Sequence, residues 1–118
     1  MESSLRDRRR YPRAVLDWPV TISLSEGAFP ARLRDISSAG MCFYLDRRVP
    51  EMTVLAMDLE LPPRAGVAEV ARVRGSGVVV RCQPVAKLVD HYEIAVFLNQ
   101  LGDDARAVIE RYVARAQA

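Results

Sequence analysis

The sequence predicts a mostly β protein, a six- to seven-stranded antiparallel β-barrel followed by a C-terminal α-helix. Three observations lead to this prediction. Between residues 16 and 98, short segments alternate apolar and polar residues, which is the pattern of strands buried on one face. Helical periodicity begins only after Gly102. Closely spaced strands with no helices between them pair antiparallel, and a sheet of about six or seven such strands tends to close into a barrel.

The first three strands are expected to surround one short turn. Residues 16–24 form the first strand, in which Pro19 marks a bulge or an edge position. After a turn at residues 25–27, a second strand runs over residues 29–34 and leads into the segment Asp35-Ile36-Ser37-Ser38-Ala39-Gly40. A third strand, residues 41–46, leaves that segment. The segment from Asp35 to Gly40 is therefore expected to be a turn held between two strands.

Four further strands and the helix complete the predicted fold. The strands are expected over residues 55–61, 67–74, 78–83 and 92–98, with Gly75-Ser76-Gly77 as a hairpin turn between the second and third of them. Asp103 or Asp104 can cap the start of the helix. Its apolar residues have the spacing of one helical face; they are Ala105, Val108, Ile109, Tyr112, Val113 and Ala116.

Length and composition indicate one globular domain. The chain has 118 residues, of which half are hydrophobic and 27% are charged, so it can bury a core and is not of disordered composition. We expect a flexible, arginine-rich arm over residues 1–12, because this segment has no periodicity and Pro12 biases Tyr11 towards extended backbone. The barrel domain is expected over residues 13–118, with its helix over residues 103–117.

Composition also disfavours several classes of protein. No apolar run approaches the roughly 20 residues that cross a bilayer, and the charged N-terminus does not resemble a secretory signal. We therefore expect a cytoplasmic protein without membrane insertion. Cys42 and Cys82 lie in apolar, strand-like segments, where an unpaired cysteine packs as a small hydrophobe. His91 is the one histidine, so no metal site is expected.

Catalytic motifs are also missing from the sequence. No carboxylates are spaced as an acid/base pair with a nucleophile, and no phosphate-binding glycine loop precedes a helix. We expect no catalytic residues, no cofactor and no enzymatic activity.

Positive charge is concentrated at the N-terminus. Residues 14–118 carry 12 basic and 13 acidic side chains, whereas residues 1–13 hold five arginines against Glu2 and Asp7. A long nucleic acid usually needs positive charge spread over a face or groove. The local cluster instead favours a small anionic ligand, since a guanidinium can hold a phosphate, contact the O6/N7 edge of guanine or stack on a base.

Two motifs carry a resemblance to a known family. Arg9-Arg10-Tyr11-Pro12-Arg13 matches RxxxR, and the segment from Asp35 to Gly40 matches (D/N)xSxxG. With a strand between the motifs and the predicted barrel and helix around them, the chain resembles the PilZ domain family over essentially its whole length. Ala95 stands where many relatives have glycine. The resemblance implies a receptor for cyclic di-GMP, a second messenger of bacterial signal transduction.

The resemblance also implies a ligand-binding set, and the chemistry of these residues agrees with it. Arginines would hold phosphate and guanine, and the Asp35 carboxylate can accept hydrogen bonds from guanine N1–H and N2–H2. The Ser37 hydroxyl can donate or accept at the ligand edge, and Gly40 allows a tight turn and close approach of the ligand to the backbone. The expected set is Arg8, Arg9, Arg10, Arg13, Asp35, Ser37 and Gly40.

Two further expectations concern the arm. Arg8 precedes the RxxxR motif, and in this respect the chain resembles members that take an intercalated cyclic di-GMP dimer, so we expect two ligand molecules per domain. Binding is expected to order residues 1–12 and so to change the surface presented to an unidentified partner protein.

Two alternatives stay open. A PilZ-like domain can act purely as a protein–protein adaptor that binds no nucleotide, and retention of both motifs is the feature that argues against this. A small nucleic-acid-binding β-barrel would need aromatic residues interleaved with basic residues on an exposed strand face. The chain has eight aromatic residues, several of them at core positions of their strands, so this alternative is less favoured.

Overall fold

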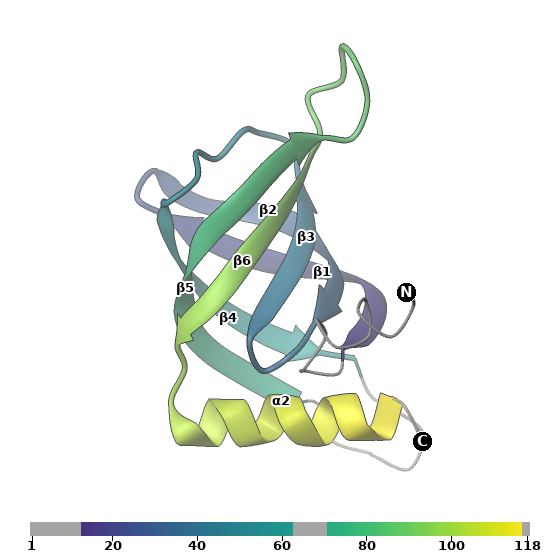
Figure 1. Ribbon diagram of the computed structural model, residues 1–118, viewed down its shortest axis with the longest axis vertical. Helices are drawn as coiled ribbons and strands as arrows, with labels where there is room; N and C mark the ends of the chain where they lie inside the picture. Colours follow the sequence, from purple (N-terminus) through teal and green to yellow (C-terminus); the bar gives the residue numbers. More distant parts are fainter. Residues whose placement is uncertain (1–12, 63–70, 117–118) are drawn as a thin grey trace, which may run out of the picture.

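The computed structural model describes residues 13–62 and 71–116, with side chains to residue 114. In this part of the chain, six antiparallel strands form a closed barrel in the order β1-β2-β3-β6-β5-β4. The strands are β1 (Ala14–Leu24), β2 (Gly27–Ile36), β3 (Gly40–Leu45), β4 (Val54–Leu61), β5 (Ala71–Pro84) and β6 (Tyr92–Gln100). Helix α2 (Asp103–Ala116) lies across one end of the barrel and packs against β5 and β1 (Figure 1). The predicted fold class is confirmed, with six strands.

The core is filled by the residues that strand alternation predicts. In β4, buried apolar residues alternate strictly with exposed ones, because one face of the strand lines the barrel interior. Helix α2 covers one end of this core with the residues of its predicted apolar face. Ile109, Tyr112 and Val113 are buried, and Ala105 and Val108 pack against the core at its edge.

In β1, Pro19 lies at an edge position, as expected, next to the half-buried Trp18. Trp18 is half-buried against the core, and its indole N–H donates a hydrogen bond to the carbonyl oxygen of Glu60 at 2.7 Å. Pro19 lies ahead of the point where β1 begins to pair with β4, at Ile22 and Ser23. An edge position of this kind tolerates proline because the missing N–H has no partner strand on that side.

One predicted turn is wrong. Gly75-Ser76-Gly77 lies within β5, which runs as a single strand where two were expected. A Cβ atom at Gly75 would lie 2.7 Å from Cδ2 of Leu101, and one at Gly77 would lie 2.6 Å from the carbonyl oxygen of Phe97. Neither glycine has a left-handed φ. The two glycines therefore allow close packing of β5 against β6 and the segment that follows it; the predicted start of this strand at Val67 lies outside the described residues.

Two β-bulges shape the outer surface of the barrel. The register of β2 with β3 shifts around Arg34, and the register of β5 with β6 shifts around Val80. In a regular strand, neighbouring side chains point to opposite faces, and a bulge breaks this alternation. As a result Arg34 and Asp35 reach the same outer surface, and so do Val80 and Arg81, where all four line one pocket.

Candidate functional site

The segment from Asp35 to Gly40 forms the tight connection between β2 and β3, as predicted. The N–H of Ser37 donates to the carbonyl oxygen of Gly40 at 2.8 Å. The Ser37 hydroxyl accepts hydrogen bonds from the N–H groups of Ala39 and Gly40, both at 3.2 Å. Ser37 is fully buried and is not among the residues that line the pocket. Its hydroxyl shapes the turn, and contact with a ligand would require these hydrogen bonds to rearrange.

Two other elements hold this turn in place. The N–H of Leu98 in β6 donates to the carbonyl oxygen of Ala39 at 2.8 Å. Nη1 of Arg106 in α2 donates to the carbonyl oxygen of Ser38 at 3.1 Å. The two consecutive carbonyls at the tip of the turn, those of Ser38 and Ala39, are therefore tied to the body of the domain.

Gly40 lies where the turn enters β3, opposite Phe97 of β6. It lines the pocket, but a Cβ atom on it would point towards β6 and lie 2.8 Å from the carbonyl oxygen of Val96. Its φ is not left-handed. The structure thus gives Gly40 a packing role between β3 and β6, and close approach of a ligand to this residue stays a prediction.

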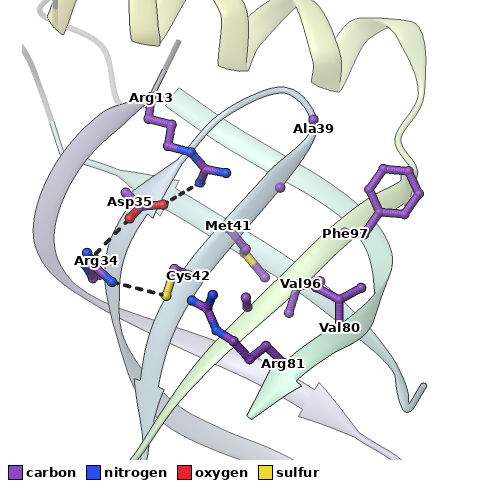
Figure 2. Close-up of a pocket in the computed structure, with 12 residues that line it drawn as sticks. Arg13, Arg34, Asp35, Ala39, Met41, Cys42, Val80, Arg81, Val96 and Phe97 are labelled. Atoms are coloured by element: carbon purple, nitrogen blue, oxygen red, sulfur yellow. Dashed lines mark hydrogen bonds and ion pairs between the residues drawn. The ribbon is translucent and has the colours of Figure 1, made fainter. Parts of the chain in front are cut away.

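The two sequence motifs meet at Arg13 and Asp35. Nη1 of Arg13 donates to Oδ1 of Asp35 at 2.8 Å (Figure 2). The antiparallel pairing of β1 with β2 brings them together, since Val15 lies opposite Asp35. The Asp35 side chain is 12% exposed and that of Arg13 is 40% exposed. The structure brings Arg13 and Asp35 together, one residue from each motif, whereas Arg8, Arg9 and Arg10 lie outside the described residues.

Arg13 and Asp35 line one side of a pocket of about 520 Å³ on the outer surface of the barrel (Figure 2). Cys42 of β3 and Ala95 of β6 pair directly in the sheet and lie in the middle of the pocket, where their small side chains leave it open. The opposite side is formed by residues of β5 and β6, namely Val80, Arg81 and Phe97. The pocket therefore has one charged side and one side that combines an arginine with apolar groups.

Opposite charges alternate along the pocket. Nε of Arg34 lies 3.7 Å from Oδ2 of Asp35, and its Nη1 donates to Oε2 of Glu93. The other oxygen of Glu93, Oε1, lies 3.9 Å from Nη2 of Arg81. The lining arginines are Arg13, Arg34 and Arg81, and with the carboxylates of Asp35 and the adjacent Glu93 they leave an excess of one positive charge. This excess of positive charge suits the pocket to an anionic ligand.

Cys42 is an unpaired thiol in the middle of the pocket. Burial raises the pKa of this thiol, and the negative charges of Glu93 and Asp35 act in the same direction, against the opposing effect of Arg34. A raised pKa keeps the group protonated at neutral pH, and a protonated thiol is a poor nucleophile. Cys42 therefore acts as the small buried residue that the sequence predicts.

Sequence reasoning did not find Arg34, Arg81, Glu93 or Phe97. Strand alternation places Arg34 and Asp35 on opposite faces, so the bulge that brings both to the pocket has no signal in the pattern. Phe97 does leave a signal, because it occupies an outward position of β6 although it is a large apolar residue. Single exposed apolar residues are common on protein surfaces, so this signal by itself does not identify a binding site.

Over residues 13–62 and 71–116, no helix is long and apolar enough to cross a membrane. In the same residues, no three histidine, cysteine, aspartate or glutamate side chains are grouped so that they could hold a metal ion.

The fold and the pocket together define a small antiparallel β-barrel, covered at one end by a helix, with a positively charged pocket on its outer surface. The model of the PilZ domain family matches residues 7–115, and the chain belongs to this family. No curated protein sequence matches the chain.

Solved structures of similar fold include three bacterial proteins. The Bacillus subtilis inhibitor of motility MotI/DgrA has a TM-score of 0.78 and 19% identity, over 93% of this chain and 51% of that protein. The PilZ domain of Escherichia coli YcgR with c-di-GMP has a TM-score of 0.65 and 14% identity, over 93% of this chain and 92% of that one. The Borreliella burgdorferi PlzA protein in complex with c-di-GMP has a TM-score of 0.61 and 11% identity, over 95% of this chain and 44% of that one. At these identities the similarity shows the fold, and this chain spans about half of MotI/DgrA.

Proposed function

We propose that this domain is a receptor for cyclic di-GMP, a ring-shaped dinucleotide with two guanines and two phosphodiesters. The observation that carries the proposal is the Arg13–Asp35 ion pair at the side of a positively charged pocket in a PilZ barrel. YcgR and PlzA, two proteins of similar fold, were solved with this ligand, which supports the choice.

Arg13 and Asp35 offer complementary contacts to one guanine and its phosphate. A guanidinium has five N–H donors, so the bond to Asp35 is compatible with further donation to a phosphate oxygen or to guanine O6 and N7. The carboxylate can accept from guanine N1–H and N2–H2, which adenine does not present in that arrangement.

Residues of the N-terminal arm complete the proposed site. Arg8, Arg9 and Arg10 would add guanidinium contacts to the phosphates and bases, and Arg8 would admit a second ligand molecule. Binding would order residues 1–12 and change the shape and charge of the surface that a partner protein contacts. In this proposal the domain is a signalling receptor or adaptor without catalytic activity.

Calorimetry of the full chain with cyclic di-GMP, with GTP and a linear dinucleotide as controls, tests the proposal. We expect selective binding of two cyclic di-GMP molecules per domain. Arg13→Ala and Asp35→Ala should each weaken binding about tenfold or more, because each removes a charge-assisted contact, while circular dichroism shows a retained fold. Arg32→Ala and Asp17→Ala are matched controls: they remove an exposed arginine–aspartate pair, with Nε and Oδ1 2.5 Å apart, that does not line the pocket.

Absence of both heat and thermal shift at high ligand concentration would refute the receptor proposal. It would favour the adaptor alternative, in which the domain binds only protein partners. A stoichiometry of one would keep the receptor and reject the two-molecule site.

A further inference from the structure

The motif residues account for one side of the pocket, and the side formed by β5 and β6 holds an arginine and an exposed aromatic ring. We infer that Arg81 of β5 and Phe97 of β6 form a second half-site, which binds the second guanine of cyclic di-GMP and the phosphodiester next to it. This inference rests on the proposed function and extends it to residues that neither motif contains.

Sheet register aligns the two halves of the pocket across four strands. Asp35 of β2 pairs with Cys42 of β3, Cys42 pairs with Ala95 of β6, and Ala95 pairs with Arg81 of β5. Neighbouring strands lie about 4.8 Å apart, so three spacings place the ends of this row roughly 14 Å apart along the curved sheet. Charged residues stand at both ends and small residues lie between them. The row can therefore contact one ligand from both sides.

Each end of this row lies at a β-bulge. The bulge in β2 brings Arg34 beside Asp35, and the bulge in β5 brings Val80 beside Arg81. Bulges are common next to binding sites because they redirect a side chain. Figure 2 shows the Arg81 side chain extending from β5 towards Cys42 in the middle of the pocket. The β5 bulge thus presents Arg81 to the pocket as the β2 bulge presents Asp35.

Phe97 supplies a surface for stacking beside the turn. It pairs with Gly40 across β3 and β6 and lines the pocket, yet it is 52% exposed. A half-exposed ring in a pocket offers a face on which a nucleobase can stack. Val80, which is also half-exposed, lines the same side and extends the apolar surface.

The charge of the pocket fits a ligand with two phosphodiesters. Three arginines line the pocket, namely Arg13, Arg34 and Arg81, against Asp35 in the pocket and Glu93 beside it. The pocket is therefore net positive, and cyclic di-GMP carries two negative charges. The contact between Arg81 and Glu93 is long, at 3.9 Å, and the Arg81 side chain is 49% exposed. Ion pairs of this kind contribute little, so Arg81 can exchange Glu93 for a phosphate oxygen at small cost.

Calorimetric titration of the full chain with cyclic di-GMP tests the second half-site through Arg81→Gln and Phe97→Ala. Each variant should bind about tenfold more weakly than the wild type. Arg81→Gln should also flatten the dependence of log Kd on log salt concentration, because one fewer phosphate charge is neutralised. Phe97→Trp should retain affinity, and its added indole fluorescence should be quenched by the ligand. The wild type, whose single tryptophan is Trp18, provides the background signal.

Two control variants separate the half-site from general effects of charge and exposed apolar area. Arg111→Gln removes one positive charge, as Arg81→Gln does, but at an exposed position of α2 outside the pocket. Met52→Ala shortens an exposed apolar side chain outside the pocket and is the control for Phe97→Ala. Both should bind as the wild type does. The second half-site would be overturned if Arg81→Gln and Phe97→Ala bound with the affinity and salt dependence of the wild type while Arg13→Ala bound weakly. The proposed function would then remain intact. Failure of the wild type to bind would overturn both.

Discussion

Replacing Gly40 by alanine should destabilise the domain even without ligand. The added Cβ atom would lie 2.8 Å from the carbonyl oxygen of Val96, which is closer than the normal contact between these atoms. This oxygen belongs to the backbone of β6, which is paired on both sides within the closed barrel and cannot swing aside as a flexible side chain would. Overpacking of this kind costs about 1–3 kcal/mol.

Thermal unfolding of the full chain, followed by circular dichroism, measures this cost. For a domain of this size, 1 kcal/mol shifts Tm by about 4 °C, so Gly40→Ala should lower Tm by roughly 4–12 °C. Gly102→Ala is the matched control, because a Cβ atom there meets no heavy atom within 4 Å and the φ of Gly102 is not left-handed. Its Tm should fall by less than about 4 °C, because Gly102 caps the start of α2 and alanine is a somewhat poorer N-cap than glycine.

The packing explanation and the ligand explanation for Gly40 differ in what this experiment shows. If Gly40→Ala unfolded at the wild-type temperature and yet failed to bind cyclic di-GMP, glycine would be needed for the ligand, and the packing argument would be refuted. A lowered Tm supports the close contact between β3 and β6 that the structure shows.

Two further predictions concern the charges around the pocket. Glu93→Gln removes the carboxylate that contacts Arg34 and Arg81. Calorimetry should therefore show that the variant binds cyclic di-GMP about threefold more tightly or better, with an affinity that falls more steeply as salt is added. Weaker binding would mean that Glu93 positions the arginines. Cys42 should react with iodoacetamide more slowly than Cys82 at pH 8, because burial and the nearby carboxylates raise the pKa of the Cys42 thiol. Peptide mass spectrometry measures the rate at which each cysteine is modified. The two rates should become similar when the protein is unfolded in urea, and equal rates in the folded protein would contradict the prediction.

Strand alternation predicts most of the barrel because it reports burial directly. The path from β2 through the turn at Asp35 into β3 follows from local sequence, as does the apolar face of α2. Gly75 and Gly77 were predicted to form a turn because glycine serves both in turns and in places of close packing. The choice between these uses depends on Leu101 and Phe97, which approach the two glycines only in the folded barrel.

The candidate site is predictable only where it lies in contiguous motifs. Arg13 and Asp35 belong to such motifs, and their ion pair follows from the pairing of β1 with β2. Arg34, Arg81 and Phe97 reach the pocket through bulges and strand register, which are properties of two strands together. No local pattern on either strand reports Arg34 or Arg81, whereas Phe97 is marked only by its outward position in β6.

The hydrogen bond from Arg106 to the carbonyl oxygen of Ser38 makes the last helix part of the site without contributing any lining residue among those described. This bond ties the first turns of α2 to the tip of the turn that carries Asp35 at its start. Shortening the chain before α2 would deprive the turn of a donor as well as uncover the core. A variant designed to alter the pocket can therefore be made far from it, at the start of the helix.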